Sequence, residues 1–241
     1  MKDPKRALRE AIKHFWAVRE KQQNRQGSSS GKKDHGSRSA VTGGKQLDKI
    51  VTLFKDLLIH HGIPGSSIHI RDTTLPGYFR PTKEWDLIVI HKQTLIASIE
   101  FKSHIGPSFG NNFNNRVEEA LGNSTDILAA YREGAFKPSQ KPWLGYFMLL
   151  EKTEKSLSPV AVREPHFSVF PEFLHKSYQD RYSQFCIRLM REQLYDSACL
   201  ILSSKSKAAS GAYEEPDPEA GFEQFLISLE SRIIAEKRKN A

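Results

Sequence analysis

Two short apolar runs lie close together in this chain, and acidic residues border them. The first run covers residues 87–90 and follows Asp86, and the second covers residues 95–99 and precedes Glu100. Runs that are mostly apolar on both faces are typical of strands buried on both sides of a sheet. We therefore expect two central strands of a covered sheet, each bordered by a carboxylate.

The turn between the two runs decides whether these carboxylates can act together. Glu100 and Lys102 share one face of their strand because side chains alternate with a period of two. Asp86 lies on that face if His91 pairs with Leu95 across a three-residue turn. A five-residue loop or a β-bulge would have the same effect. A two- or four-residue turn is expected to put the acids on opposite faces.

Asp86, Glu100 and Lys102 suggest metal-assisted hydrolysis of a phosphodiester. Carboxylates are hard oxygen ligands for Mg²⁺, so Asp86 and Glu100 are the expected metal ligands, helped by the backbone carbonyl of Phe101. Lys102 would orient the attacking water or neutralise charge at phosphorus. The alternative is an ion pair or a solvated strand face, although unpaired charge beside such apolar strands would be costly. His104 could lie on the same face, as a supporting or surface residue.

The positive charge of the chain is concentrated near its start. Residues 1–46 carry 12 Lys and Arg against 4 Asp and Glu, whereas residues 47–241 carry 24 of each. We expect a basic N-terminal helix and a Gly/Ser/Lys-rich linker over residues 1–45, followed by one nuclease domain over 46–241. The basic part fits a polyanionic partner such as DNA. It could equally be a solvated helix and linker.

The composition suggests a cytoplasmic protein. No run approaches the length of a membrane span, and the start lacks an apolar signal region, so no membrane partner is expected. The two cysteines, Cys186 and Cys199, form no metal-spaced set and suggest no disulfide framework.

Periodicity and turn residues predict an α/β fold, with a mixed central sheet flanked by helices. Asp217 and Pro218 are expected to be the N-cap and first residue of the last helix. Helices are expected at residues 4–23, 46–61, 115–132, 176–195 and from 218 to about 238. Strands are expected at 68–70, 87–90, 95–99, 143–150 and 198–203, with loops at 24–45, 75–81, 106–115 and 151–175.

The loop expected at residues 106–115 contains a cluster of asparagines. Asparagine side chains can read adenine edges, and glycines allow the backbone to approach phosphate closely. The candidate DNA contacts are Asn111, Asn112, Asn114, Asn115 and Arg116. A simpler reading is that Asn114 or Asn115 caps the following helix.

Two stretches of the sequence carry a resemblance to a known family. They are the segment Gly-Tyr-Phe-Arg-Pro-x-Lys-x-Trp-Asp at residues 77–86 and the run from Phe101 to Phe136. Together they closely resemble the XhoI family of type II restriction endonucleases, which belongs with the PD-(D/E)xK nucleases. The resemblance implies a restriction-endonuclease-like fold and assigns the acids and lysine of that group to Asp86, Glu100 and Lys102. Trp85 stands where the group's pattern has proline.

The resemblance also implies an activity. The expected reaction is Mg²⁺-dependent double-strand cleavage by a homodimer at the palindrome CTCGAG, leaving four-base 5′ extensions. Protection of the host's own DNA would then need a separate cognate methyltransferase. Two alternatives stay open: a repair or structure-selective nuclease on the same scaffold, and a non-catalytic DNA-binding protein whose Asp-Glu-Lys cluster is only an ion network.

Overall fold

A five-stranded mixed sheet forms the centre of the molecule, as expected from the sequence. The computed structural model describes residues 3–29 and 45–239. The strand order is β1-β4-β5-β6-β7, with antiparallel pairing from β1 to β5 and parallel pairing from β5 to β7. The strands are β1 (Ile68–His69), β4 (Leu87–His91), β5 (Thr94–His104), β6 (Trp143–Glu151) and β7 (Ser197–Ser203).

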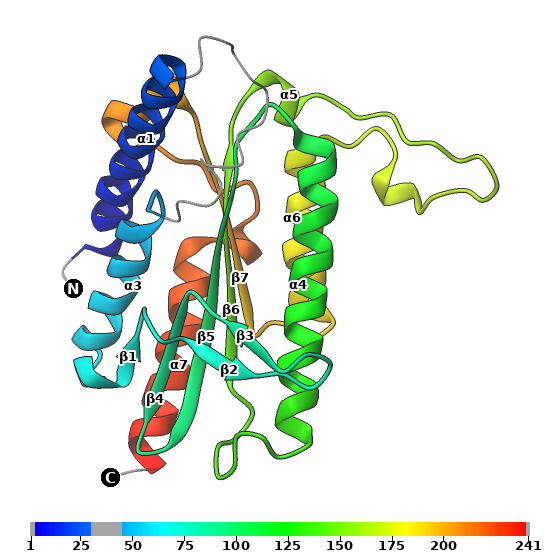
Figure 1. The fold of residues 1–241 in the computed structure, drawn as a ribbon. Helices are drawn as coiled ribbons and strands as arrows, with labels where there is room; N and C mark the ends of the chain where they lie inside the picture. The colour runs from blue at the N-terminus through cyan, green and yellow to red at the C-terminus, as the bar shows by residue number, and fades with distance from the viewer. Residues whose placement is uncertain (1–2, 30–44, 240–241) are drawn as a thin grey trace.

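Helices cover both faces of this sheet, which explains why its strands are mainly apolar on both sides (Figure 1). One face is covered by α1 (Pro4–Ser29), α3 (Asp48–His60) and α7 (Phe222–Lys239). The other is covered by α4 (Phe109–Arg132) and α6 (Tyr178–Arg191), and the short α5 (Glu154–Leu157) follows β6. Among the described helices, none has the length and hydropathy needed to cross a bilayer.

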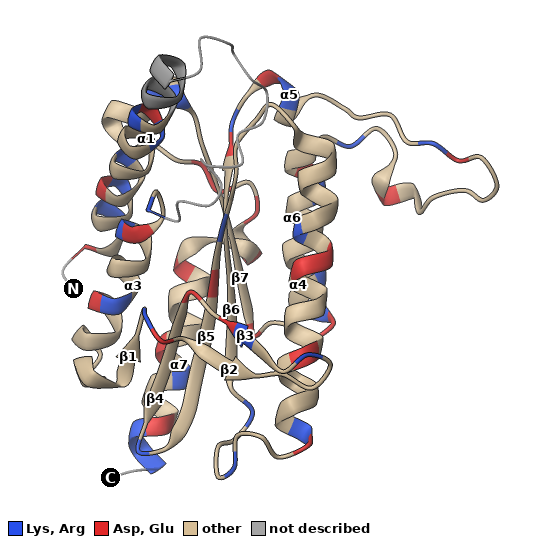
Figure 2. Cartoon of the chain, viewed as in Figure 1, with Lys and Arg blue, Asp and Glu red and all other residues tan. Residues whose placement is uncertain are grey.

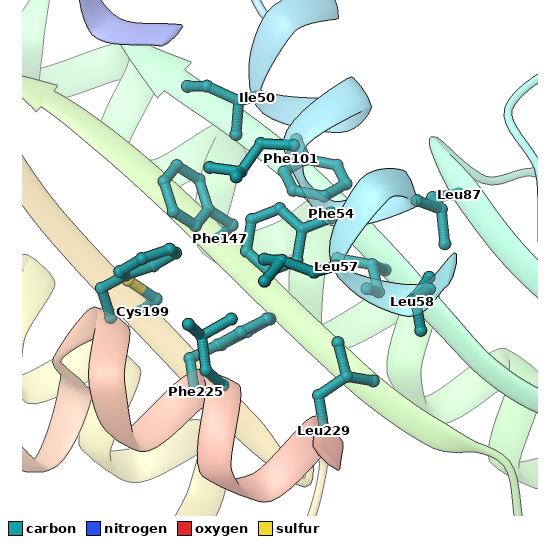
Figure 3. Packing of buried hydrophobic residues seen from close by; sticks show 14 of the residues in the cluster. Ile50, Phe54, Leu57, Leu58, Leu87, Phe101, Phe147, Cys199, Phe225 and Leu229 are labelled. Carbon is teal, nitrogen blue, oxygen red and sulfur yellow. The ribbon is translucent and has the colours of Figure 1, made fainter. Parts of the chain in front are cut away.

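Phe54 is the centre of the first of these two cores (Figure 3). Its ring centroid lies 5.1 Å from that of Phe101, 5.4 Å from that of Phe225 and 5.8 Å from that of Phe147. These rings come from α3, β5, α7 and β6, so the packing joins helices to the strand that carries Glu100. Edge-on and tilted aromatic pairs of this kind add stability beyond the area they bury.

The N-terminal helix belongs to the same core. Leu8, Ile12, Phe15 and Trp16 are buried in the cluster around Phe54, and the Trp16 indole donates to the Ser203 hydroxyl at the end of β7 (3.0 Å). Helix α1 also extends to Ser29, so the prediction that it ends at residue 23 was wrong. The remainder of the expected linker, residues 30–44, lies outside the described part of the chain.

The β4–β5 connection combines a two-residue turn with a bulge. His91 pairs with Thr94 across Lys92 and Gln93, which both have positive φ (48° and 63°), as in the mirror-image turns that suit hairpins. The pairing then shifts by one residue at the bulge, so that Leu87 lies opposite Ile99. The bulge was one of the expected solutions. A two-residue turn was expected to separate the acids, and the bulge reverses its effect.

The loops predicted at 75–81, 106–115 and 151–175 all contain some regular structure, and the last of them includes helix α5. Residues 74–84 form a hairpin of β2 (Thr74–Pro76) and β3 (Thr82–Glu84), and helix α4 begins at Phe109, within the loop predicted at 106–115. Phe109 and Phe113 are four residues apart and both pack on Tyr178 of α6. This tertiary packing overrides the weak helix propensity of the glycine and asparagines around them.

The start of the last helix differs from the prediction, whereas the charge at its end matches what the helix dipole favours. Asp217 and Pro218 do cap a helix, but it is the short 3₁₀ turn Pro218–Ala220, and α7 starts afterwards at Phe222. The last turn of α7 is basic, with Lys237, Arg238 and Lys239 at its negative end (Figure 2).

Candidate active site

The structure brings Asp86, Glu100 and Lys102 together on the sheet face covered by α4 and α6. Leu87 pairs with Ile99, and the same register continued by one residue sets Asp86 opposite Glu100. The backbone N–H of Phe101 donates to Asp86 Oδ2 at 2.8 Å, and this hydrogen bond connects the residue before β4 to the middle of β5. The geometric condition set by the sequence is therefore met.

Glu100 is fully buried and held from several directions. The Asn123 amide of α4 donates to Oε1 at 2.7 Å, and the Tyr195 hydroxyl donates to Oε2 at 3.2 Å. Lys83 Nζ lies 2.8 Å from Oε1, and Lys102 Nζ lies 3.7 Å from the same oxygen. Burial by itself raises the pKa of the Glu100 carboxyl, but the two ammonium groups and these hydrogen bonds outweigh it, so the pKa lies below its ordinary value. Glu100 is thus kept ionised without contact to bulk water.

The surroundings of Asp86 shift its pKa in the opposite direction, above its ordinary value. Its carboxyl group is half-buried, and burial raises its pKa, against the opposing influence of Lys102 and the Phe101 N–H. Neighbouring Glu100 also raises this pKa, because two carboxylates on adjacent strands repel each other. The pair therefore carries negative charge that a cation would stabilise.

Lys83, on β3, is a site residue that sequence reasoning missed. Its ammonium group is nearer to Glu100 than that of Lys102, and it also lies over the Trp85 ring, 5.0 Å from the centroid. The only local signal was its place three residues before Asp86. Its convergence on Glu100 depends on the β2–β3 hairpin, where the sequence predicted no strands and only a loop over residues 75–81.

Asp86 and Glu100 are the residues that could hold a divalent metal ion such as magnesium. Asp86 and Glu100 offer hard carboxylate oxygens on one face, and Phe101 between Glu100 and Lys102 contributes a backbone carbonyl to the same strand segment. In the part of the chain that the structure describes, no group of three or more His, Cys, Asp and Glu side chains forms a richer metal site. Mg²⁺ takes few protein carboxylates and completes its shell with water and phosphate, so two acids are enough.

The asparagine cluster lies in the first turns of α4 rather than in a loop. Asn111, Asn114 and Asn115 are exposed, Asn112 is half-buried, and Arg116 forms an ion pair with Glu119. The position before the helix is occupied by Ser108, so the expected capping by Asn114 or Asn115 was wrong. The asparagine that does contact the site is Asn123, further along α4.

His104 belongs to the core beside the site. It lies on the same face as Glu100, with its Nδ1 2.7 Å from the Tyr182 hydroxyl and its Nε2 3.3 Å from the Ser108 carbonyl. Burial lowers the pKa of His104 to about 4, so the ring is neutral at physiological pH. It supports β5 and the start of α4 from inside the protein, and the possibility of a surface residue is excluded by its burial.

Comparisons with known proteins agree on one family. The model for restriction endonuclease XhoI matches residues 25–215. Type II restriction enzyme BstVI of Geobacillus stearothermophilus is 49% identical over 210 residues, which cover 85% of this chain and 94% of the relative. Type II restriction enzyme XhoI of Xanthomonas vasicola is 41% identical over 189 residues, 77% of this chain and 75% of the relative.

A third relative, type II restriction enzyme AbrI of Azospirillum brasilense, is 47% identical over 167 residues, 68% of this chain and 74% of the relative. No solved structure shows significant similarity to the chain. The family match and the relatives both include the strands that carry the acidic pair and the lysine. This protein belongs to the XhoI family of type II restriction endonucleases.

Proposed function

We propose that the protein cuts both strands of DNA at a palindromic site in a Mg²⁺-dependent reaction, with Asp86, Glu100 and Lys102 as its catalytic residues. The observation that carries this proposal is the acidic pair on adjacent strands, with the Lys102 ammonium 3.7 Å from the Glu100 carboxylate. The family resemblance suggests CTCGAG as the site and four-base 5′ extensions as the product ends.

The residues of the site have distinct tasks in this proposal. Asp86 and Glu100 would hold Mg²⁺, which polarises the phosphate and makes the attacking water more acidic when bound. Lys102 adds positive charge where the transition state gathers negative charge on the phosphate oxygens. Asn123 and Tyr195 fix the Glu100 carboxylate, so its position is set before DNA arrives.

DNA contacts and assembly complete the proposal. The N-terminal turns of α4 present Asn111, Asn112, Asn114, Asn115 and Arg116 at the positive end of the helix dipole, which favours phosphate. A homodimer suits a palindrome because two equal subunits read two equal half-sites. A separate methyltransferase would protect the cell's DNA, and both enzymes would act in the cytoplasm.

Digestion of linear DNA of known sequence tests this function. With Mg²⁺ we expect discrete fragments whose ends, once sequenced, map to CTCGAG with 5′ extensions, and with EDTA we expect intact DNA. Discrete fragments that map to another hexamer would change the specificity but keep the function. Cleavage restricted to junctions or mismatches would indicate a structure-selective nuclease, and DNA left intact under all metal conditions would indicate a binding protein.

A further inference from the structure

The β2–β3 hairpin ends in two exposed aromatic side chains. Tyr78 is 55% exposed and Phe79 is 71% exposed, and their rings meet edge to face with centroids 5.1 Å apart. Large aromatic side chains normally gain stability by burial, so exposing two neighbours at one turn costs hydrophobic free energy. Contiguous exposed apolar groups of this kind mark interaction surfaces.

The hairpin tip is held in place by one buried carboxylate. Asp126 Oδ1 accepts hydrogen bonds from the backbone N–H groups of Tyr78 and Phe79, both at 2.7 Å, and Oδ2 accepts from Arg80 Nε at 2.8 Å. Burial alone would raise the pKa of Asp126, but these donors hold the pKa below its ordinary value. A tip fixed this way presents its rings at little cost in conformational entropy on binding.

The same tip is linked to the catalytic carboxylate. Arg80 Nη2 donates to Asn123 Oδ1 at 2.5 Å, and Asn123 Nδ2 donates to Glu100 Oε1 at 2.7 Å. The other end of the hairpin supplies Lys83, 2.8 Å from the same oxygen. The side chains of Arg80 and Asn123 therefore connect the turn of the hairpin to Glu100 through two consecutive hydrogen bonds.

We propose that Tyr78 and Phe79 form a DNA-contact tip, in which the two rings pack against nucleotides of the duplex next to the scissile phosphate. This inference rests on the proposed function, because it needs DNA at Glu100. Aromatic rings pack on bases and sugars of any sequence and can act as wedges between base steps. The Asp126–Arg80–Asn123 network would hold this contact in a fixed relation to the catalytic residues.

The test measures DNA affinity in the cleavage-defective Lys102→Ala protein, by fluorescence anisotropy with a labelled duplex that contains the cleavage site. Adding Tyr78→Ala and Phe79→Ala should weaken binding by about tenfold or more, as expected for lost aromatic contacts with nucleotides. The salt dependence of binding should stay unchanged, because no phosphate-binding charge is removed.

The matched control is Ile227→Ala with Ile234→Ala, which removes two exposed apolar side chains from α7 on the opposite face of the sheet. Its affinity should change less than about twofold.

Three outcomes would overturn the inference. One is unchanged affinity in the double variant with an unaltered thermal unfolding curve. A second is a loss of affinity no larger than in the α7 control. A third is a shift from dimer to monomer in sedimentation without a change in DNA affinity per dimer, which would assign the tip to a protein interface.

The inference and the proposed function fail separately. If the wild-type protein cuts no DNA with Mg²⁺, the proposed function fails. If the wild-type cuts and Tyr78→Ala/Phe79→Ala cuts equally well at limiting DNA concentration, only the DNA-contact tip is excluded. Gly77→Ala gives an independent check, because its added Cβ would lie 2.6 Å from the Arg80 carbonyl and against the Asp126 carboxylate. It should displace the tip and reproduce the loss of affinity while both rings are present.

Discussion

Lys83 Nζ lies 2.8 Å from Glu100 Oε1, closer than the Lys102 ammonium that the sequence pattern singles out. The carboxylate is fully buried, and both lysines are mostly buried. A charge in such surroundings is stable only if its partners are present, since removing one partner leaves the other unpaired. The position of β3, which pairs with β2 outside the central sheet, is therefore as important to the charge of Glu100 as the strand that carries it.

Lys102→Ala should abolish cleavage while sparing most DNA binding. One ammonium group at the scissile phosphate contributes strongly to the transition state but little to total affinity, which is spread over many contacts. Cleavage rates under single-turnover conditions and anisotropy binding curves measure the two effects. A parallel loss of binding and folding would show that Lys102 has a structural task instead.

Lys83→Met should lower the free energy of unfolding by about 1–3 kcal/mol, because Glu100 loses its nearest cation but keeps Lys102. The matched control is Lys5→Met, which breaks an exposed pair with Glu223 of similar length (2.7 Å) and should leave the unfolding curve nearly unchanged, because water screens this pair. Urea unfolding curves give both values. Adding Glu100→Gln to Lys83→Met should restore part of the loss, and a strictly additive result would contradict the coupling between the two residues.

The stability of the protein should fall as the pH drops from about 7 to 5, partly because of His104. Its folded pKa of about 4 lies below the ordinary value of 6.5, so the unfolded state binds the proton first. The contribution of neutral His104 to the free energy of unfolding is complete above pH 6.5 and is lost as the pH falls toward 4. Between pH 7.5 and 5 this lowers the free energy of unfolding by roughly 2 kcal/mol. Urea unfolding of His104→Asn at both pH values should show a smaller difference than wild type. His166→Asn, on the exposed segment before α6, should keep the wild-type difference.

The β4–β5 turn should accept a stabilising replacement. Lys92 and Gln93 both adopt positive φ, which asparagine and glycine tolerate better. Lys92→Asn with Gln93→Gly should raise the free energy of unfolding by about 0.5–1 kcal/mol without altering the register. The control is Lys92→Ala with Gln93→Ala, which keeps the turn length but introduces no residue that tolerates positive φ. If this control raised the free energy of unfolding equally, positive φ would not be the reason for the stabilisation.

Phe15→Ala should destabilise the protein by about 3–5 kcal/mol, because the side chain is fully buried between α1 and the rest of the core. Glu20→Ala, at an exposed position of the same helix, should have little effect. Thermal unfolding distinguishes the two. Because of this packing, deletion of residues 1–23 would remove part of the core. The contribution of the basic helix to DNA binding must therefore be measured with single replacements of its charged residues.

The sequence alone determined the parts of this protein that depend on neighbouring residues. Alternation within β5 placed Glu100 and Lys102 on one face, and the two largely apolar runs predicted central strands with helices on both sides. The asparagines of residues 111–115 show the limit of local reasoning. Their loop-like composition predicted a helix only from residue 115, yet the packing of Phe109 and Phe113 on α6 accompanies a helix that starts at Phe109.

Only the tertiary structure decided how the candidate site is assembled. A two-residue turn and a bulge together set Asp86 opposite Glu100, and neither has a strong signal in residues 91–96. Lys83 of β3, Asn123 of α4 and Tyr195 of the α6–β7 connection reach Glu100 over sequence separations of 17, 23 and 95 residues. Such contacts arise from the packing of whole elements rather than from local preference. The acidic pair and Lys102 could therefore be predicted from the sequence, whereas the contacts of Lys83, Asn123 and Tyr195 with Glu100 could not.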